Sequence, residues 1–141
     1  MNPVFLNLNE ALRIHRDQIE RYGGDPGIRD LGLLESAVAM PSAGFGGSYL
    51  LDDRFEMAAA YLFHIVMNHP FVDGNKRTGI ATALVFLEIN DLEVNVSQDA
   101  LVNMVLAITK GKADKGGIAA FFRKHSREFP PAAPAGQAGK E

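Results

Sequence analysis

The sequence is organised around eleven consecutive residues, His69-Pro70-Phe71-Val72-Asp73-Gly74-Asn75-Lys76-Arg77-Thr78-Gly79. They lie between two apolar segments with helical spacing. The run from Thr78 to Ile89 predicts a helix, so Asp73-Gly74-Asn75 is expected to be the turn before it. Lys76 and Arg77 then fall near a helix N-terminus, where the macrodipole disfavours cations. A glycine turn, free backbone N–H groups and two cations together favour a bound anion, above all phosphate.

The composition places the chain among ordinary globular proteins. Its 141 residues predict one domain, with 47% hydrophobic and 22% charged residues. The net charge of −3 and the absence of a basic block give no reason to expect direct nucleic-acid binding. No cysteine is present, which excludes disulfides and thiolate metal sites.

Neither a targeting segment nor a membrane span is expected. Met1-Asn2-Pro3 is not a basic region followed by an apolar core, so it does not indicate a signal peptide. The longest apolar run, around Ile80 to Leu87, is too short to cross a bilayer. The sequence therefore predicts a cytoplasmic protein.

The fold class is predicted to be all-α, a compact bundle of about six helices. Apolar residues recur at helical spacing in six segments that have capping and stop signals. These are a helix after Asn7 that ends at Gly23-Gly24, a short helix between Asp30 and Pro41, one after Asp52 or Asp53 that leads to His69, one over Thr78–Ile89, one from Ser97 to near Lys110-Gly111, and one that contains Ile118 and His125.

Three segments fall outside the helices. Residues 42–51 contain three glycines and predict a loop, either a cover for a site or a flexible connection. Residues 92–96 predict a short extended piece. The Pro/Ala/Gly-rich residues 127–141 predict a disordered tail after a domain that spans residues 1–126.

Two residues of the central stretch have a reactive and a structural interpretation. His69 continues the apolar stripe of the preceding helix, which favours a core histidine, but beside an anion-binding turn an imidazole is also suited to be a general base. Asp73 is either the cap of the following helix or a ligand of Mg²⁺, which takes one or two carboxylates plus phosphate oxygens.

The other residues of the stretch add positioning and charge. Phe71 is expected to anchor the loop from beneath, and Gly74 lets the backbone turn close to a ligand. Asn75 is expected to cap the helix or donate to a phosphate. Lys76 and Arg77 are either solvated or hold phosphate as a point charge and a planar fork. Together these residues predict phosphoryl or nucleotidyl transfer, in which catalysis is mostly positioning and charge stabilisation.

The segment from His69 to Arg77 closely resembles the signature of the Fic/Doc superfamily, His-x-Phe-x-(Asp/Glu)-(Gly/Ala)-Asn-(Gly/Lys)-Arg. Its ending, Asn75-Lys76-Arg77, is of the Doc type, whereas Fic adenylyltransferases have Asn-Gly-Arg. Pro70 and Gly74 are more similar to Fic proteins. The resemblance to death-on-curing toxins covers roughly residues 5 to 125 and includes the segments Arg21-Tyr22-Gly23-Gly24, Gly27-Ile28-Arg29-Asp30 and Ala58-Ala59-Ala60-Tyr61-Leu62.

The resemblance implies a function and a set of site residues. His69 would be the general base and Asp73 the Mg²⁺ ligand. Phosphates would be held by Gly74, Asn75, Lys76 and Arg77. A Doc-type member would transfer the γ-phosphate of ATP to a Thr or Ser hydroxyl, with elongation factor Tu as the expected target, and would thereby stop translation. Lys76 stands where Fic enzymes have glycine, and lysine there is associated with a reversed nucleotide pose.

The resemblance also implies a partner and leaves two alternatives. No Glu is followed by Gly or Asn, as in self-inhibited Fic proteins, so a separate Phd-like antitoxin is expected to inhibit in trans. Ile80 occupies the position where Fic enzymes often carry a second arginine, which favours the Doc type. The alternatives are a Fic-type AMP transferase and a catalytically silent, antitoxin-binding autoregulator.

Overall fold

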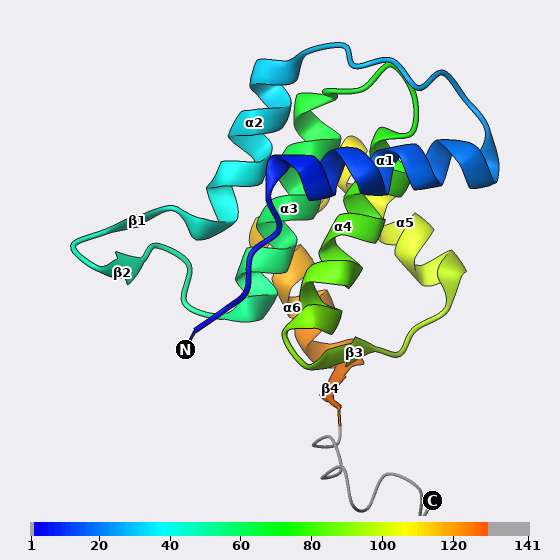
Figure 1. Ribbon diagram of the computed structural model, residues 1–141. Helices are drawn as coiled ribbons and strands as arrows, with labels where there is room; N and C mark the ends of the chain where they lie inside the picture. Colours follow the sequence, from blue (N-terminus) through cyan, green and yellow to red (C-terminus); the bar gives the residue numbers. More distant parts are fainter. Residues whose placement is uncertain (1, 130–141) are drawn as a thin grey trace, which may run out of the picture.

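The computed structural model describes residues 2–129, which form six α-helices, a 3₁₀ turn and four short strands. The predicted all-α bundle is confirmed, with two small sheets added at its edges (Figure 1). In chain order the elements are α1 Leu8–Tyr22, α2 Leu31–Ala39, η1 Met40–Ser42, β1 Gly44–Phe45, β2 Ser48–Tyr49, α3 Arg54–Asn68, α4 Asn75–Ile89, β3 Leu92–Val94, α5 Gln98–Thr109, α6 Lys115–His125 and β4 Ser126–Glu128.

Side-chain caps begin most of the helices. Asn7 and Glu10 form the predicted capping box at α1. Each of the other capping side chains accepts a hydrogen bond from the backbone N–H of the third helical residue, and they are Asp30, Asp53, Ser97 and Asp114. Among the α-helices within residues 2–129, only α4, which follows the central stretch, begins without a side-chain cap.

The core is built around α3. This helix lies in the middle of the bundle and packs against α2, α4 and α6 (Figure 1). It buries eight of its fifteen residues, including the small consecutive residues Ala58, Ala59 and Ala60. Small side chains let neighbouring helices approach closely. The two helices that flank the central stretch are therefore both buried, and α3 is the more deeply buried of the two.

The segment 42–51 contains a short hairpin instead of an irregular loop. Strands β1 and β2 pair in antiparallel fashion, with Gly46 and Gly47 at the turn in left-handed conformations. The hairpin lies at the N-terminal end of α3, whereas the central stretch lies at the C-terminal end of the same helix (Figure 1). In the observed fold, residues 42–51 therefore do not cover the central stretch.

The predicted extended piece at 92–96 is confirmed in part as β3, which pairs with β4 after the last helix. Because β4 runs to Glu128, the ordered chain crosses the boundary expected after residue 126. The remainder of the predicted tail, residues 130–141, lies outside the described residues.

The segment between α1 and α2 crosses the central stretch. Ile28 and Phe71 form an antiparallel bridge, and the N–H groups of Arg29 and Asp30 both donate to the carbonyl of Pro70. The N–H of Val72 donates in turn to the carbonyl of Gly27, at 3.0 Å. Residues 27–30, which are far from the central stretch in the sequence, thus hold residues 70–72 in place.

Candidate active site

One pocket gathers the polar residues predicted from the central stretch. It has a volume of about 470 Å³ and lies between the end of α3 and the start of α4. Its lining includes all six predicted catalytic, metal and phosphate residues, namely His69, Asp73, Gly74, Asn75, Lys76 and Arg77. The seventh, Phe71, is fully buried, as expected for an anchor. Thr109, at the end of α5, also lines the pocket and had no sequence signal.

His69 ends α3 and is exposed. The interpretation as a core histidine is therefore wrong. Its backbone has φ 50° and ψ 53°, the left-handed region that residues other than glycine seldom adopt. Arg29 stabilises this turn from outside, because its guanidinium donates to the carbonyls of His69 at 2.6 Å and Asn68 at 2.8 Å.

Asn75 ties the loop together. Its side-chain oxygen accepts from the N–H of Phe71 at 2.9 Å, and its amide nitrogen lies 2.9 Å from the Phe71 carbonyl and 3.1 Å from Nδ1 of His69. The residue is 5% exposed. Both amide hydrogens are engaged within the loop, so the side chain neither caps α4 nor has a hydrogen left for a phosphate in this conformation.

The contact between Asn75 and His69 has a consequence for proton transfer. The two contacts to Phe71 determine which end of the amide carries the nitrogen, and this NH₂ group can only donate to Nδ1. A neutral ring that accepts at Nδ1 carries its proton on Nε2. A general base at Nε2 needs the opposite tautomer, so this contact must change before His69 takes a proton there.

Asp73 does not cap α4, because the N-cap position is Gly74. Its Oδ2 accepts from the backbone N–H of Asp25 at 2.8 Å, while Oδ1 has no partner among residues 2–129. No cluster of three or more His, Asp or Glu side chains that could hold a metal occurs in that range. One carboxylate with a free oxygen fits Mg²⁺ that arrives with a nucleotide, since this ion keeps waters and phosphate oxygens as its other ligands.

The N-terminus of α4 faces the pocket without a cap. The helix begins at Asn75, three residues earlier than predicted, with Gly74 at φ 81° before it. Within the described range the backbone N–H groups of Asn75, Lys76 and Arg77 have no acceptor. Lys76 is exposed, and its ammonium has no partner there. Uncapped donors and a free cation make this end of the pocket suitable for phosphate oxygens.

Arg77 is turned toward α1. Its guanidinium donates to the carbonyl of Gly23 at 3.0 Å and to that of Gln18 at 3.5 Å, and it lies 5.6 Å from the ring centre of Tyr22. A cation is favourable at this helix C-terminus. Arg77 therefore joins α4 to α1 through two of its five N–H donors, and it also lines the pocket.

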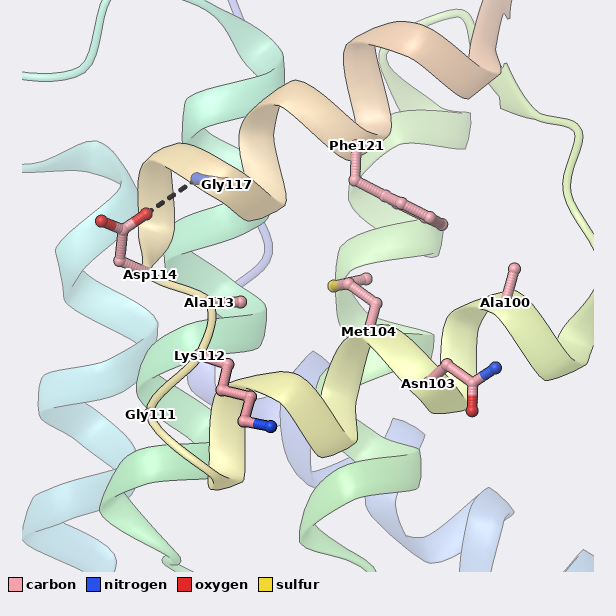
Figure 2. A pocket seen from close by; sticks show the side chains of 9 residues that line it. All are labelled: Ala100, Asn103, Met104, Gly111, Lys112, Ala113, Asp114, Gly117 and Phe121. Carbon is pink, nitrogen blue, oxygen red and sulfur yellow. Dashed lines mark hydrogen bonds between the residues drawn. The ribbon is translucent and has the colours of Figure 1, made fainter.

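A second hollow lies elsewhere in the described part of the chain. It has a volume of about 610 Å³, lies between α5 and α6, and is lined by residues such as Asn103, Lys112 and Phe121 (Figure 2). None of its lining residues belongs to the central stretch. The smaller pocket is therefore the candidate active site, because there the cations, the carboxylate and the uncapped helix meet.

Comparison with known proteins identifies the family of the chain. A family model described as "Fic/DOC family" matches residues 5–87, more than half of the chain. The matched region runs from before α1 to the end of α4, and so contains every predicted site residue. In the part of the chain that the structure describes, no helix is long and apolar enough to span a membrane.

Two curated relatives are similar to this chain. "Protein kinase doc" of Escherichia phage P1 is 32% identical over 115 residues, which are 82% of this chain and 90% of that protein. "Toxin Doc" of Mycolicibacterium smegmatis is 42% identical over 78 residues, which are 55% of this chain and 60% of that protein. The resemblance to Doc-type proteins is thus confirmed, and the chain belongs to the Fic/DOC family.

Proposed function

We propose that this protein is a Doc-type toxin that transfers the γ-phosphate of Mg-ATP to a Thr or Ser hydroxyl of a protein target. The observation that carries the proposal is the pocket in which the exposed His69, the carboxylate of Asp73 and the uncapped start of α4 with Lys76 meet. The names of the two relatives, a protein kinase and a toxin, agree with this assignment.

The proposed reaction is an in-line displacement. The target oxygen attacks the γ-phosphorus, the bond from that phosphorus to the β–γ bridging oxygen breaks, and ADP leaves. The hydroxyl proton passes to Nε2 of His69 once the ring has changed tautomer. The helix N–H groups and Lys76 would hold phosphate oxygens. Asp73 would hold Mg²⁺, which neutralises developing charge on the phosphates.

Two residues take revised roles in this proposal. Asn75 positions the loop and His69, since its amide is engaged by Phe71 and the imidazole. Arg77 holds α4 against α1, since its donors bond to Gly23 and Gln18. Asn75 would contact a phosphate only by leaving these partners, whereas Arg77 keeps three further N–H donors beside the pocket.

The proposed target is elongation factor Tu, with arrest of protein synthesis in the cytoplasm as the outcome. We further propose that a separate Phd-like antitoxin neutralises the protein in trans. Both proposals rest on the resemblance to Doc-type members and on the names of the relatives. Co-expression with the product of an adjacent small gene tests the second one, because growth should recover and the two proteins should purify together.

The test of the reaction uses the purified protein, Mg²⁺, elongation factor Tu and ATP labelled at the α or the γ phosphate. Label from γ alone, lost in His69→Ala, is the expected result. Label from α would mean AMP transfer and would overturn the kinase assignment. Toxicity that survives His69→Ala in cells would instead support the alternative of a catalytically silent protein that binds its antitoxin.

A second variant tests the role of Lys76. Lys76→Gly restores the residue type found in Fic adenylyltransferases and removes the exposed ammonium from the pocket. We expect transfer from γ-labelled ATP to fall at least tenfold, while the free energy of unfolding falls by no more than about 1 kcal/mol, the cost of glycine in a helix at an exposed position. Lys110→Gly, at another exposed lysine outside the pocket, is the control. Equal rates in the Lys76 variant and the wild type would exclude a phosphate contact by Lys76.

A further inference from the structure

His15 of α1 lies directly beneath the loop and has no part in the proposed reaction. It is 3% exposed, and its Nε2 lies 2.9 Å from the backbone carbonyl oxygen of Asp73. A carbonyl only accepts, so the imidazole donates and its Nε2 carries a proton. The ring also stacks on Phe71, with ring centres 3.7 Å apart and planes inclined by 3°.

The two contacts of His15 lead to two different residues of the site, Asp73 and His69. Asp73 supplies the carboxylate proposed for Mg²⁺, and His15 holds its peptide group. Phe71 is bonded through its N–H and carbonyl to Asn75, whose amide contacts Nδ1 of His69. One buried imidazole thus holds the backbone carbonyl of Asp73 by a hydrogen bond and contacts the exposed histidine indirectly, through its stack on Phe71.

The ring lies close to the backbone of Gly74. A Cβ atom placed on Gly74 would lie 3.7 Å from Cδ2 of His15 and 3.2 Å from Cδ1 of Ile19. An apolar side chain would fill the same space without the cost of burying a polar ring. The hydrogen bond to Asp73 is the contact that an apolar residue cannot supply.

We propose that His15 is a positioning residue for the transfer reaction, with two separable contributions. Its hydrogen bond to the Asp73 carbonyl sets the carboxylate and thus affinity for Mg-ATP, and its stack on Phe71 sets the orientation of His69 and thus the rate of transfer. This inference rests on the proposed function, and it assigns a role to a residue of α1 that touches neither substrate.

Two substitutions separate the contributions. His15→Phe keeps an aromatic ring against Phe71 and removes the donor, so KM for Mg-ATP should rise roughly three- to tenfold, the range for loss of one hydrogen bond, with kcat nearly unchanged. His15→Gln keeps an N–H donor at similar reach and removes the stack, so kcat should fall several-fold with KM nearly unchanged. His64→Gln, at a half-buried histidine next to Lys115, is the control.

The measured KM and kcat of the variants either support or overturn the positioning role of His15. The expected split, with the control equal to wild type, supports the two contributions. Values of KM and kcat equal to wild type in both variants would overturn the positioning role. Equal loss in the Phe and Gln variants, without a split, would reduce His15 to a structural residue of the core.

A second measurement does not depend on activity. The protein has four histidines, and each ring is assigned in ¹⁵N NMR spectra by loss of its signal in a His→Gln variant. The His69 ring signals should shift in His15→Gln and stay in place in His64→Gln. Unchanged His69 signals in His15→Gln would overturn the link from the stack to His69. If the wild type transfers neither phosphate nor AMP, the proposed function fails, and this comparison alone decides whether His15 positions His69.

Discussion

His69 combines an exposed ring with a strained backbone. At a helix C-terminus the left-handed conformation is usually taken by glycine, because a Cβ atom costs about 1 kcal/mol or more there. Here a histidine takes it at φ 50°. Strain of this kind persists when the surroundings enforce it, and hydrogen bonds from Arg29 and Asn75 do so. The backbone strain therefore marks the residue on which the reaction is proposed to depend.

Two replacements of His69 separate the effect of its backbone strain on stability from the effect of its imidazole on transfer activity. His69→Gly and His69→Ala both lack the imidazole, so both should lose transfer activity. Only glycine relieves the left-handed strain, and the Gly variant should exceed the Ala variant in free energy of unfolding by about 1 kcal/mol. Urea denaturation measures the difference. An Ala variant as stable as the Gly variant would show that the turn is not strained.

At the scale of elements, the site depends on the close approach of α3 and α4. Gly79 lies in α4 where the two helices meet. A Cβ atom there would lie 2.9 Å from Cδ1 of Leu62, 3.1 Å from Cγ2 of Val66 and 3.3 Å from the Leu62 carbonyl oxygen. The last glycine of the central stretch thus serves helix packing, and the packing fixes where the uncapped end of α4 faces His69.

Alanine at two helical glycines tests this close approach. Gly79→Ala gains about 1 kcal/mol in helix propensity but forces contacts that cost roughly 1–3 kcal/mol, so a net loss of stability is expected. Gly117→Ala in α6 is the matched control, because its nearest contact is an ordinary 3.5 Å to the Asp114 carboxylate. It should stabilise the fold by about 0.5–1 kcal/mol. A Gly79→Ala protein more stable than wild type in thermal denaturation would refute the argument.

At the scale of the molecule, long-range hydrogen bonds connect the N-terminal segment to the core. The hydroxyl of Tyr61 accepts from the N–H of Leu6 at 2.9 Å and donates to the Leu6 carbonyl at 3.1 Å. Tyr61 is fully buried, and this burial raises its pKa to about 12. A single side chain of α3 thereby satisfies both backbone groups of a segment that has no secondary structure.

Removal of this hydroxyl should be costly. Tyr61→Phe leaves two buried backbone groups of Leu6 without partners, and a loss of about 2 kcal/mol in the free energy of unfolding is expected. Tyr49→Phe, at a residue 41% exposed, is the control and should change stability by less than about 0.5 kcal/mol. Equal effects of the two substitutions, measured by urea denaturation, would contradict the role given to Tyr61.

Two histidines should make the whole molecule less stable in acid. Burial lowers the pKa of His15, assisted by the charge of Arg77 and opposed by the bond to Asp73, and burial followed by the charge of Lys115 lowers the pKa of His64. In the unfolded chain the two imidazoles are protonated near pH 6.5. In the folded protein they are protonated only at lower pH. The free energy of unfolding should therefore fall as pH drops through 6.5 and level off below the folded pKa values.

Substitution tests this pH dependence. Urea denaturation of the wild type at pH 7.5 and pH 5.5 measures the acid loss, and His15→Gln and His64→Gln should each make it smaller. Reversed behaviour, with greater stability at pH 5.5 that the substitutions abolish, would mean that the charged rings are stabilised in the fold.

Local patterns in the sequence were sufficient to predict the helices and the residues that make up the site. Caps such as Asn7, Asp30 and Ser97 act within one turn, so their effect is visible in a few residues. The central stretch is equally local in composition, since His69, Asp73 and Lys76 lie within eight consecutive residues and line one pocket. The number of helices and the six predicted residues of the pocket, five polar side chains and Gly74, were predictable for this reason.

The roles within the site were decided by tertiary structure. Asn75 and Arg77 were predicted to hold phosphate, yet they bond to Phe71, His69, Gly23 and Gln18. The role of His15 is visible only in the folded chain, where its Nε2 lies 2.9 Å from the carbonyl oxygen of Asp73. The carbonyls that accept from Arg77 and His15 lie 54 to 59 residues away in the sequence, so only the packing of the helices brings them close. The partners of Asn75 are four and six residues away, within the same loop. The sequence by itself determined which chemical groups meet, and the tertiary structure determined which of them remain free to act.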